Sequence, residues 1–542
     1  MKPRPFPPLL FLAALVLPAS LDSCRQGPGA RPPREAVQAR EGAREEGPGK
    51  LVILHINDFH GQVFPLPATW APRRDWKNGK PPLQGGAAAV AAYVKRVRAA
   101  AALSGATVLF LDTGDWFQGT PEGNETKGRI VMEWFTRMGL EATVVGNHDF
   151  DYGWTNLVAL VHSVRFPVLA ANILPPGTDP EKAMKGPEPP KPADDLKPYW
   201  VKRVRGVRIL FFGLILKDTP SVTAGPLGGV EFAGEEKTFR AWLPRLRAEG
   251  DQFVLMTHDG VQIDKSLAKR LQDVKRLKII LGGHSHTRLS RPIVEGHIRI
   301  FQTHGKGTEI DHIEYQVLPR KKEIRFRKSR VVDLRLDSVG RDPETRAWLA
   351  ERTRPIREKW DKPVGVLSAD LRRTRARRSS SAGNLAADVT RWAAEADIGF
   401  ANKGGLRCNL PKGKVTRRDI FQFIPFDNTI VVMPLRGSEI RRALDVFFRT
   451  GRSALEVSGI RVHYKGRKVT KVILPGGTPL NPRSVYKVAM NSYLAGSGDK
   501  SGIFRANPRK RDTGIKLRTA LLKYIKKNPV TKVPVENRYV RD

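Results

Sequence analysis

Short apolar runs alternate with segments of helical periodicity through most of the chain after residue 50. The runs have the length of buried strands, and apolar residues recur every three or four positions in the segments between them. This alternation predicts an α/β fold in which helices pack on sheets. We expect strands at residues 51–56, 107–111, 142–145, 168–171, 207–214, 253–256, 278–281 and 298–302, and helices at 87–102, 129–138, 384–395 and 438–449.

One break in this pattern divides the chain into two domains. Asp342 and Pro343 form a helix start, an N-cap followed by a first-turn proline, and open a charged helix that runs toward Trp360. Residues 174–198 are rich in Pro, Lys, Glu and Asp, and are expected to form a surface insertion. We therefore predict a first domain at residues 51–340, a linker helix at 341–360 and a second, smaller α/β domain at 361–542.

The N-terminus has the layout of a secretory signal peptide. Lys2 and Arg4 precede an apolar stretch that is too short to span a membrane. The segment ends in Leu-Asp-Ser-Cys, which resembles a bacterial lipobox, so we predict a signal peptide at 1–23, a lipid anchor on Cys24 and a flexible tether at 24–50. The alternative is a conventional cleavage site with an incidental cysteine. Both interpretations predict an exported protein of the periplasm or cell envelope.

Composition narrows the class of protein without identifying it. Of the 542 residues, 40% are apolar and 8% are aromatic, which excludes collagen-like, coiled-coil and polytopic membrane proteins. Two cysteines cannot form a disulfide framework or a thiolate zinc site. The net charge is +40, and residues 351–542 hold 42 basic against 16 acidic residues. Such a field attracts phosphates, acidic surfaces or nucleic acid, so weak electrostatic binding of nucleic acid is one expectation.

The ends of five predicted strands carry Asp, Asn or His side chains. In open α/β sheets the carboxyl ends of strands are where sites form, so these side chains are expected to converge. All are oxygen or imidazole donors, which suit Zn, Mn, Fe or Co. They are too many for one ion, whereas two divalent ions bridged by one carboxylate would use them all and leave room for water and substrate. The candidates are Asp58, His60, Asp115, Asn147, His258, His284 and His286.

The order of these motifs resembles the calcineurin-like metallophosphoesterase signature. The forms LHINDFHG, GDWFQGTP and GNHDFDYG resemble the bacterial 5′-nucleotidase family, which implies a four-layer α/β/β/α catalytic domain. The resemblance also implies that His148, oriented by Asp151, stabilises the transition state or protonates the leaving oxygen, tasks that suit an imidazole titrating near neutrality. It implies one metal held by Asp58, His60, Asp115 and His286, and another held by Asp115, Asn147, His258 and His284.

The resemblance continues into the second domain, where it implies a nucleoside pocket. The segments 401–407, 424–428 and 493–499 are similar to the family's substrate-binding motifs. Aromatic pairs stack on many bases, and arginine's planar fork matches phosphate. By this similarity Phe426 and Tyr493 enclose the base, Asn428 binds its edge, Asp499 binds the ribose hydroxyls and Arg407 binds phosphate.

Three departures from the family pattern concern this pocket. Lys403 replaces a usual glycine, and would either favour more highly charged substrates or point to solvent. Asp499 is followed by Lys500 and Ser501 instead of glycine and an aromatic residue. The family normally has further arginines that bind phosphate. Here five arginines lie close together in that region, and the sequence does not indicate which of them contacts phosphate: Arg372, Arg373, Arg375, Arg377 and Arg378.

These motifs predict an exported, metal-dependent phosphoric ester hydrolase. It would release phosphate from a nucleotide or nucleotide-sugar by attack of a metal-activated water, as a 5′-nucleotidase, UDP-sugar hydrolase or 2′,3′-cyclic nucleotide phosphoesterase does. One alternative is a thiosulfohydrolase of sulfur oxidation, which shares the two-domain architecture and a dinuclear site; the nucleoside pocket argues against it. A second alternative is a non-catalytic surface lipoprotein that binds polyanions, which has no need of the metal ligands.

Overall fold

The computed structural model describes residues 47–68, 71–77, 81–186, 188–223, 225–374, 378–450, 455–496 and 498–542. The predicted signal peptide, the predicted lipid anchor at Cys24 and all but the end of the predicted tether lie outside these residues. The last two tether residues, Gly49 and Lys50, begin the first strand. Among the helices in the described ranges, none is long and apolar enough to cross a membrane.

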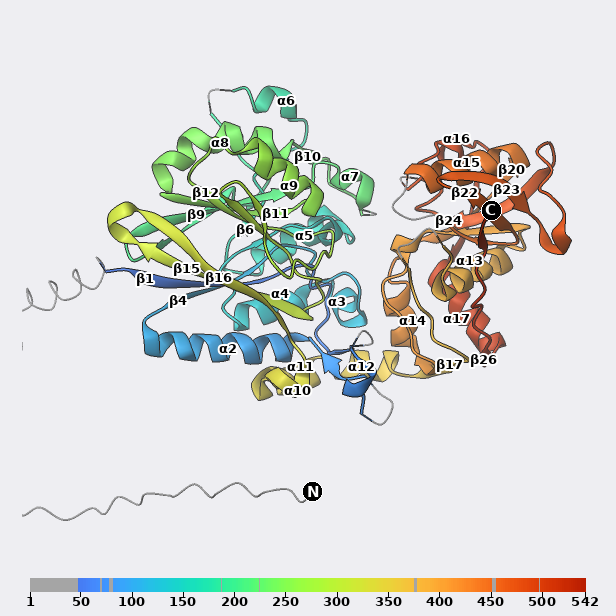
Figure 1. Ribbon diagram of the computed structural model, residues 1–542, viewed down its shortest axis with the longest axis horizontal. Coiled ribbons are helices and arrows are strands. Elements are labelled where there is room, and N and C mark those ends of the chain that lie inside the picture. The colour runs from blue at the N-terminus through green and yellow to red at the C-terminus, as the bar shows by residue number, and fades with distance from the viewer. Residues whose placement is uncertain are drawn as a thin grey trace, which may run out of the picture. The chain divides into compact units, whose positions relative to one another are not determined.

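The first domain contains two mixed β-sheets (Figure 1). In the first sheet, β1 runs parallel to β4 and antiparallel to β15, and β16 forms the edge. This sheet consists of β16 (Glu323–Asp333), β15 (Glu309–Leu318), β1 (Gly49–Ile56) and β4 (Thr107–Asp112). The second has the order β13 (Ile293–Glu295), β14 (Ile298–Phe301), β12 (Leu277–Leu281), β11 (Gln252–His258), β9 (Val207–Ile215) and β8 (Tyr199–Val204).

Three layers of apolar side chains separate four layers of secondary structure. Successive residues of a strand point to opposite faces, so Leu51 of β1 packs between the two sheets, whereas Val52 packs against helices. On β9, Phe211 lies between the sheets and Phe212 packs against the helices on the far side. The α/β/β/α arrangement is therefore confirmed. Its outer helices are α2 (Ala87–Ser104), α4 (Arg129–Arg137) and α5 (Trp154–His162) on one side, and α8 (Glu235–Glu249) and α9 (Val261–Arg270) on the other.

Short elements connect these layers, and some of them carry site residues. The strands β5 and β6 pair with each other in parallel, and Ala142 joins them to the end of β4 through a single bridge to Leu111. The described residues of the predicted insertion at 174–198 include one short helix. These elements are β2 (Leu66–Pro67), β3 (Leu83–Gln84), β5 (Thr143–Val144), β6 (Val168–Leu169), β7 (Ile173–Leu174), β10 (Glu231–Phe232), α3 (Pro121–Glu125), α6 (Pro180–Ala183), α7 (Thr219–Val222) and α10 (Leu336–Val339).

The linker consists of two helices instead of the single predicted one. Asp342 caps the first helix as expected, because its side chain accepts a hydrogen bond from the backbone N–H of Thr345. The helix ends where Pro355 follows, since proline has no N–H to continue the ladder of hydrogen bonds. The two helices are α11 (Pro343–Arg352) and α12 (Arg354–Trp360).

The second domain is built around a five-stranded mixed sheet with two smaller sheets beside it. The large sheet has the order β21 (Glu456–Ser458), β18 (Ile398–Ala401), β24 (Val485–Asn491), β20 (Thr429–Arg436) and β25 (Arg511–Lys516). The smaller sheets are β19 (Gly413–Thr416), β17 (Pro363–Leu367) and β26 (Val530–Thr531), and β23 (Lys468–Ile473), β22 (Arg461–Lys465) and β27 (Tyr539–Arg541). Its helices are α13 (Ser381–Ala394), α14 (Arg417–Phe423), α15 (Gly437–Thr450), α16 (Ile503–Ala506) and α17 (Leu517–Lys527).

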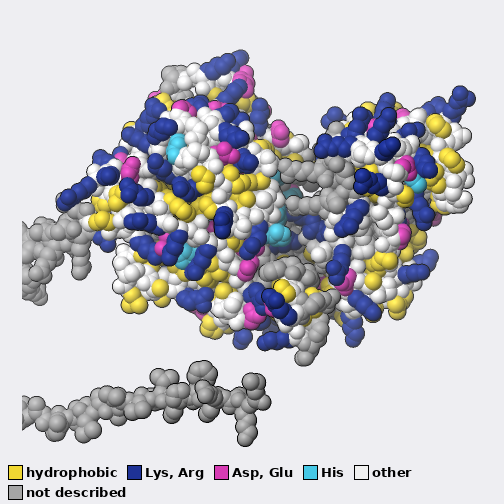
Figure 2. Space-filling view, in the orientation of Figure 1, with side chains coloured by type: hydrophobic (Ala, Val, Ile, Leu, Met, Phe, Trp, Pro, Cys, Tyr) yellow, Lys and Arg dark blue, Asp and Glu magenta, His cyan; other side chains and the backbone are white. Residues whose placement is uncertain are grey.

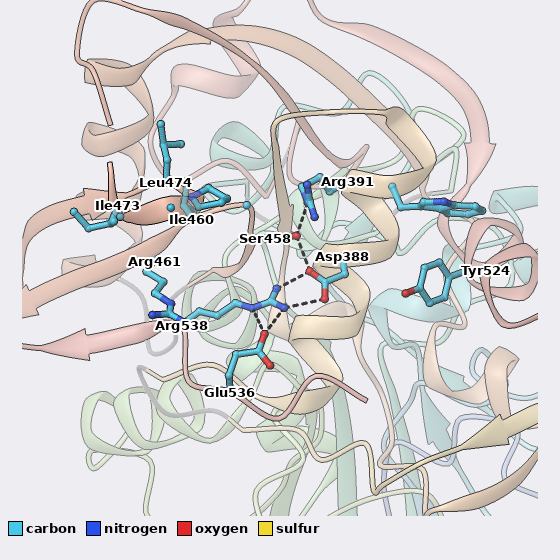
Figure 3. Close-up of a pocket in the computed structure, with 15 residues that line it drawn as sticks. Asp388, Arg391, Ser458, Ile460, Arg461, Ile473, Leu474, Tyr524, Glu536 and Arg538 are labelled. Carbon is cyan, nitrogen blue, oxygen red and sulfur yellow. Dashed lines mark hydrogen bonds and ion pairs between the residues drawn. The ribbon is translucent and has the colours of Figure 1, made fainter. Parts of the chain in front are cut away.

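The charged side chains of the chain lie mostly at the surface, where Lys and Arg are spread over the face shown in Figure 2. Among the buried exceptions, one group ties the end of the chain to α13 (Figure 3). There the guanidinium of Arg538 donates hydrogen bonds at 2.7 and 2.8 Å to the two carboxylate oxygens of Asp388, and also contacts Glu536. Ser458 donates a further hydrogen bond to Asp388 at 2.6 Å. This bidentate network fixes the last strand against the core of the second domain.

Candidate metal centre and substrate cavity

The structure brings the predicted metal ligands to one place at the carboxyl ends of the strands. Residues that follow β1, β4 and β5 meet the last residue of β11 and the turn after β12. Five of the seven side chains are buried, and His284 and His286 are half-buried. Their hydrogen bonds and close contacts place Asp58, His60, Asp115, Asn147, His258, His284 and His286 in a single site.

Two groups within this site have the spacing of metal ligands, and they share Asp58. In the first, Asp58 Oδ1 lies 3.2 Å from His286 Nε2 and 3.9 Å from His60 Nε2. In the second, Asp58 joins Asp115 and His258, whose Oδ2 and Nε2 atoms are 3.3 Å apart. The same Asp115 oxygen is 3.6 Å from His60 Nε2. The Asp115 carboxylate therefore contacts one imidazole of each group.

The remaining two candidates lie beside the second group. The imidazole Nδ1 of His284 lies 2.8 Å from Asn147 Oδ1, and its ring centre lies 5.4 Å from that of His258. The backbone N–H of His284 donates to Asp58 Oδ2 at 3.0 Å. Both residues thus face the same site as the carboxylates.

Five of the ligands adopt the left-handed backbone conformation, which was not predicted from the sequence. Side chains other than glycine rarely have positive φ, and each such residue stores strain of about 1–3 kcal/mol. Tight turns after the strands require it here, because they aim successive side chains at one point. The φ angles are 51° for Asp58, 51° for His60, 56° for Asp115, 70° for His284 and 49° for His286.

Asp149 stabilises the turns of the site through hydrogen bonds to the backbone and is not one of the candidate metal ligands. Its carboxylate accepts hydrogen bonds from the backbone N–H groups of Asp115, Trp116 and Gly146, at 2.8 to 3.0 Å. It thereby ties the turn after β4 to the turn that carries Asn147. No role was predicted for Asp149 from the sequence, where its place in the Gly-Asn-His-Asp motif was the available signal.

Burial and neighbouring charges shift the pKa values of the candidate ligands in different directions: the lowered values of three imidazoles favour metal binding, whereas the raised values of Asp58 and His258 oppose it. Burial lowers the pKa of His284 to about 3 and lowers the pKa values of His60 and His286, so these imidazoles are neutral at pH 7. Burial also raises the pKa of Asp58 to about 6. For His258, burial acts to lower the pKa, but the carboxylates of Asp115 and Asp58 outweigh it and raise the pKa to about 10.

The site fits divalent metal ions by its own chemistry. Two of its buried atoms, Asp58 Oδ1 and His258 Nε2, make no hydrogen bond, although an unpaired buried polar atom costs about 1–3 kcal/mol. Both atoms point toward the other ligands, and a cation placed there would pair with them. Neutral imidazoles and carboxylates without thiolates are the donor set of Zn, Mn, Fe or Co.

His148 and Asp151 form the predicted pair beside this site. The Nδ1 atom of His148 lies 3.0 Å from Asp151 Oδ2, and the backbone N–H of His148 donates to Asp115 Oδ1 at 2.8 Å. Burial acts to lower the pKa of His148, but the carboxylates of Asp151 and Asp115 raise it overall. The imidazole ring lies 5.6 Å from the His60 ring and 5.5 Å from the Phe426 ring, measured between centres.

A cavity lined by both domains joins His148 to the predicted substrate residues. Arg407 Nη2 lies 3.1 Å from His60 Nε2 and 3.2 Å from His286 Nε2, so its guanidinium is in contact with the first group of ligands. It also lies over the Phe426 ring at 5.8 Å. The cavity is lined by Asn147, His148, Asp151, Val222, Thr223, His284, Asn402, Gly404, Gly405, Arg407, Phe426, Asn428 and Tyr493.

Asp499 does not belong to the residues that line this cavity in the described part of the chain. Its carboxylate accepts hydrogen bonds from the backbone N–H groups of Ser501, Phe504 and Arg505 at 2.8 to 2.9 Å. These are the contacts of a helix cap at the start of α16. The ribose-binding role of Asp499 stays a prediction.

Lys403 has neither of the orientations that the sequence suggested. Its side chain is 5% exposed, and Nζ donates at 2.6 Å to Glu456 Oε1 and at 2.7 Å to the carbonyl of Arg378. Lys403 therefore forms a buried ion pair and reaches neither a substrate phosphate nor solvent. Of the neighbouring arginines, Arg372 pairs with Asp370, and Arg375 and Arg377 lie outside the described residues.

Comparisons with known proteins agree with this geometry. Residues 51–288 match the calcineurin-like phosphoesterase model, and residues 363–506 match the 5′-nucleotidase C-terminal domain model. The chain is 27% identical to the 5′-nucleotidase of Bos taurus, over 91% of each chain, and 26% identical to the snake venom 5′-nucleotidase of Naja atra, over 86% of this chain and 94% of that protein.

Solved structures show the same architecture. A 5′-nucleotidase precursor from Thermus thermophilus superimposes with a TM-score of 0.79 at 28% identity, covering 91% of this chain and 99% of that one. A sulfate thiohydrolase from the same species, 20% identical, shares the fold with a TM-score of 0.74 over 91% of this chain and 97% of that one.

The fold and the clustered side chains define a metallophosphoesterase, a hydrolase whose first domain carries candidate metal ligands at the ends of its strands. Its second domain narrows the class. The chain belongs to the 5′-nucleotidase family, which combines a calcineurin-like phosphoesterase domain with a 5′-nucleotidase C-terminal domain.

Proposed function

We propose that this protein releases phosphate from nucleotides outside the cytoplasm. One observation carries the proposal: the cavity that holds His148 and the ligands Asn147 and His284 also holds Arg407 and the aromatic ring of Phe426. A phosphate bound at the metal centre would therefore extend toward an arginine and an aromatic side chain, which suits a nucleotide. Export by the signal peptide at 1–23, with a lipid anchor on Cys24 in the periplasm or cell envelope, is part of the proposal.

The metal ligands divide into two sets, as the resemblance implies. Asp58, His60, Asp115 and His286 would hold one divalent ion, and Asp115, Asn147, His258 and His284 would hold the other. When bound, such ions offset phosphate charge and lower the pKa of water so that a nucleophile exists at neutral pH. The strained turns fix these donors in place before a substrate arrives.

The remaining site residues act on the substrate. Arg407 donates hydrogen bonds to phosphate oxygens, because its guanidinium already lies against the ligand imidazoles. His148, with its Nδ1 held by Asp151, presents Nε2 to the reacting phosphate and stabilises its charge or donates a proton to the leaving oxygen. Phe426 and Tyr493 stack on the base, and Asn428 binds its edge.

The two alternatives have less support. The sulfate thiohydrolase of Thermus thermophilus shares the fold alone, and Phe426 and Tyr493 on the cavity wall favour a nucleoside over a sulfur substrate. A non-catalytic polyanion binder would gain nothing from buried, unpaired ligand atoms such as Asp58 Oδ1, which reduce stability.

Phosphate release from a panel of substrates tests the proposal. The panel contains AMP, ADP, UDP-glucose, 2′,3′-cyclic AMP, an aryl phosphate and, for the sulfur alternative, a thiosulfonate. We expect chelator to abolish hydrolysis of at least one nucleotide, and added Mn or Zn to restore it, because the proposed reaction needs a metal ion to activate the attacking water. Activity that survives chelation, or DNA binding with no hydrolysis of any compound, would contradict the proposal.

A further inference from the structure

A short segment of the first domain contacts two of the functional residues from one side of the cavity. This segment, residues 218–223, contains α7 and is called the α7 segment below. Two of its residues, Val222 and Thr223, line the cavity, and each makes one hydrogen bond to a residue of the turn at 147–151. Neither residue belongs to the sequence motifs described above.

The first contact fixes the amide of Asn147. Its nitrogen, Nδ2, donates to the carbonyl of Val222 at 3.1 Å, which leaves Oδ1 on the opposite side, 2.8 Å from the imidazole of His284. Only the amide oxygen can bind a metal ion, since the amide nitrogen is a donor without a free lone pair. The α7 segment therefore sets which end of Asn147 faces the metal ligands.

The second contact fixes the carboxylate of Asp151. Thr223 Oγ1 donates to Asp151 Oδ1 at 3.3 Å, while the other oxygen of Asp151 lies 3.0 Å from His148 Nδ1. A carboxylate held through both oxygens cannot rotate away from the imidazole. Thr223, Asp151 and His148 thus form a chain of hydrogen bonds that ends at the ring facing the cavity.

Hydrogen bonds fix the α7 segment at its start and just beyond its end, and only the far end lies against this turn. At its start, the buried Thr219 donates through Oγ1 to the carbonyl of Leu216 at 2.6 Å. Just beyond its end, the backbone N–H of Trp154 donates to the carbonyl of Pro226 at 2.9 Å. Gly225 passes so close to the turn that a Cβ atom there would lie 1.8 Å from the carbonyl oxygen of Phe150. This close approach makes the segment a fixed support.

We propose that Thr223 is a positioning residue, which acts on phosphate ester hydrolysis by orienting Asp151 and, through it, the imidazole of His148. The inference deepens the proposed function and rests on the role given there to His148. It assigns no contact between Thr223 and the substrate. A positioning role lowers kcat when it is lost, because the imidazole is no longer aligned, and leaves substrate binding unchanged.

The test compares Thr223→Val, which keeps the shape and removes the hydroxyl, with Thr223→Ser, which keeps the hydroxyl. We expect Thr223→Val to lower kcat about tenfold, the usual effect of losing a supporting hydrogen bond at a metal site, with KM and metal content near those of the wild type. Thr223→Ser is expected to recover most of kcat. Ser221→Ala is the matched control, because Ser221 is exposed and its hydroxyl donates to the backbone carbonyl of Asp218, the N-cap of α7.

Each variant is assayed on AMP and on 4-nitrophenyl phosphate, which separates this inference from the proposed function. Hydrolysis of the aryl phosphate alone would refute the nucleotide assignment and still test Thr223. Wild-type kcat in Thr223→Val, or a raised KM with unchanged kcat, would overturn the positioning role. Failure of Thr223→Ser to restore kcat would also overturn it, since the hydroxyl would then not be the active feature.

Discussion

At the scale of single residues, His148 differs from its neighbours because it contacts both the metal site and the cavity without being needed as a ligand. Its backbone N–H donates to Asp115, and its ring centre lies 5.6 Å from that of His60 and 5.5 Å from that of Phe426. Burial acts to lower its pKa, but the carboxylates of Asp151 and Asp115 raise it overall, so the ring holds a proton more readily than a free imidazole does. These contacts suit a residue that transfers a proton or stabilises charge.

Replacing His148 by alanine should separate chemistry from metal binding. We expect His148→Ala to lower the turnover of phosphate release by about 10² to 10⁴, the range for a lost general acid or base, while bound metal stays at the wild-type level. Metal analysis and initial-rate assays on the same preparation measure both. His162→Ala is the control, because His162 is an exposed histidine of the same domain. Full activity with metal retained would remove His148 from the mechanism.

At the scale of elements, the buried pair of Lys403 and Glu456 joins three parts of the second domain. Lys403 lies in the turn after β18, and Glu456 is the first residue of β21. Ser380, the N-cap of α13, donates a hydrogen bond to Glu456 Oε1 at 2.6 Å. Burial acts to lower the pKa of Lys403, and Glu456 opposes this shift. The pair therefore holds the turn that leads to the cavity residues Gly404, Gly405 and Arg407 against the core of the second domain.

Removing one partner of this pair should destabilise the second domain. We expect Lys403→Met to lower the free energy of unfolding by about 3–5 kcal/mol, because the Glu456 carboxylate would remain buried without a cation. Urea unfolding followed by circular dichroism measures the loss. The exposed Lys414 provides the control variant Lys414→Met, and adding Glu456→Gln to Lys403→Met should recover part of the stability. Equal shifts in Lys403→Met and Lys414→Met would contradict this account.

The elements also show how far the sequence predicts the structure. Every predicted strand and helix occurs within three residues of its expected bounds, except the linker helix, because each buries a continuous apolar face. The hairpin of β15 and β16 was missed, since charged residues interrupt its apolar positions and only one residue of its edge strand is fully buried. That the candidate metal ligands lie together could be predicted from their places at strand ends. The partners of Lys403 and Thr223 could not, because they lie in distant segments of the sequence.

At the scale of the whole molecule, the chain has a net charge of +40, and the proposed substrate is an anion. Lys and Arg side chains are spread over the visible surface, and Arg407 lies at the metal ligands. A field of this sign raises the rate at which anionic substrates reach the site, and salt screens it over about 8–10 Å at physiological ionic strength. The association step, and not the chemical step, should therefore respond to salt.

Ionic strength provides the corresponding prediction. We expect kcat/KM for AMP to fall several-fold as sodium chloride is raised from about 20 to 300 mM, with kcat nearly constant, because screening weakens steering alone. An ester of lower charge, such as bis(4-nitrophenyl) phosphate, should show a shallower dependence. Identical dependence for both substrates, or a fall confined to kcat, would show that the surface charge has no part in substrate capture.

The left-handed turns that carry five metal ligands have a consequence for how this protein could change. A backbone with positive φ favours glycine, so selection for folding stability alone would favour glycine at Asp58, His60 or His284. Each such substitution would relax the main chain and remove a donor atom. At these turns, a substitution that increases folding stability would therefore remove a side chain that the proposed metal site needs.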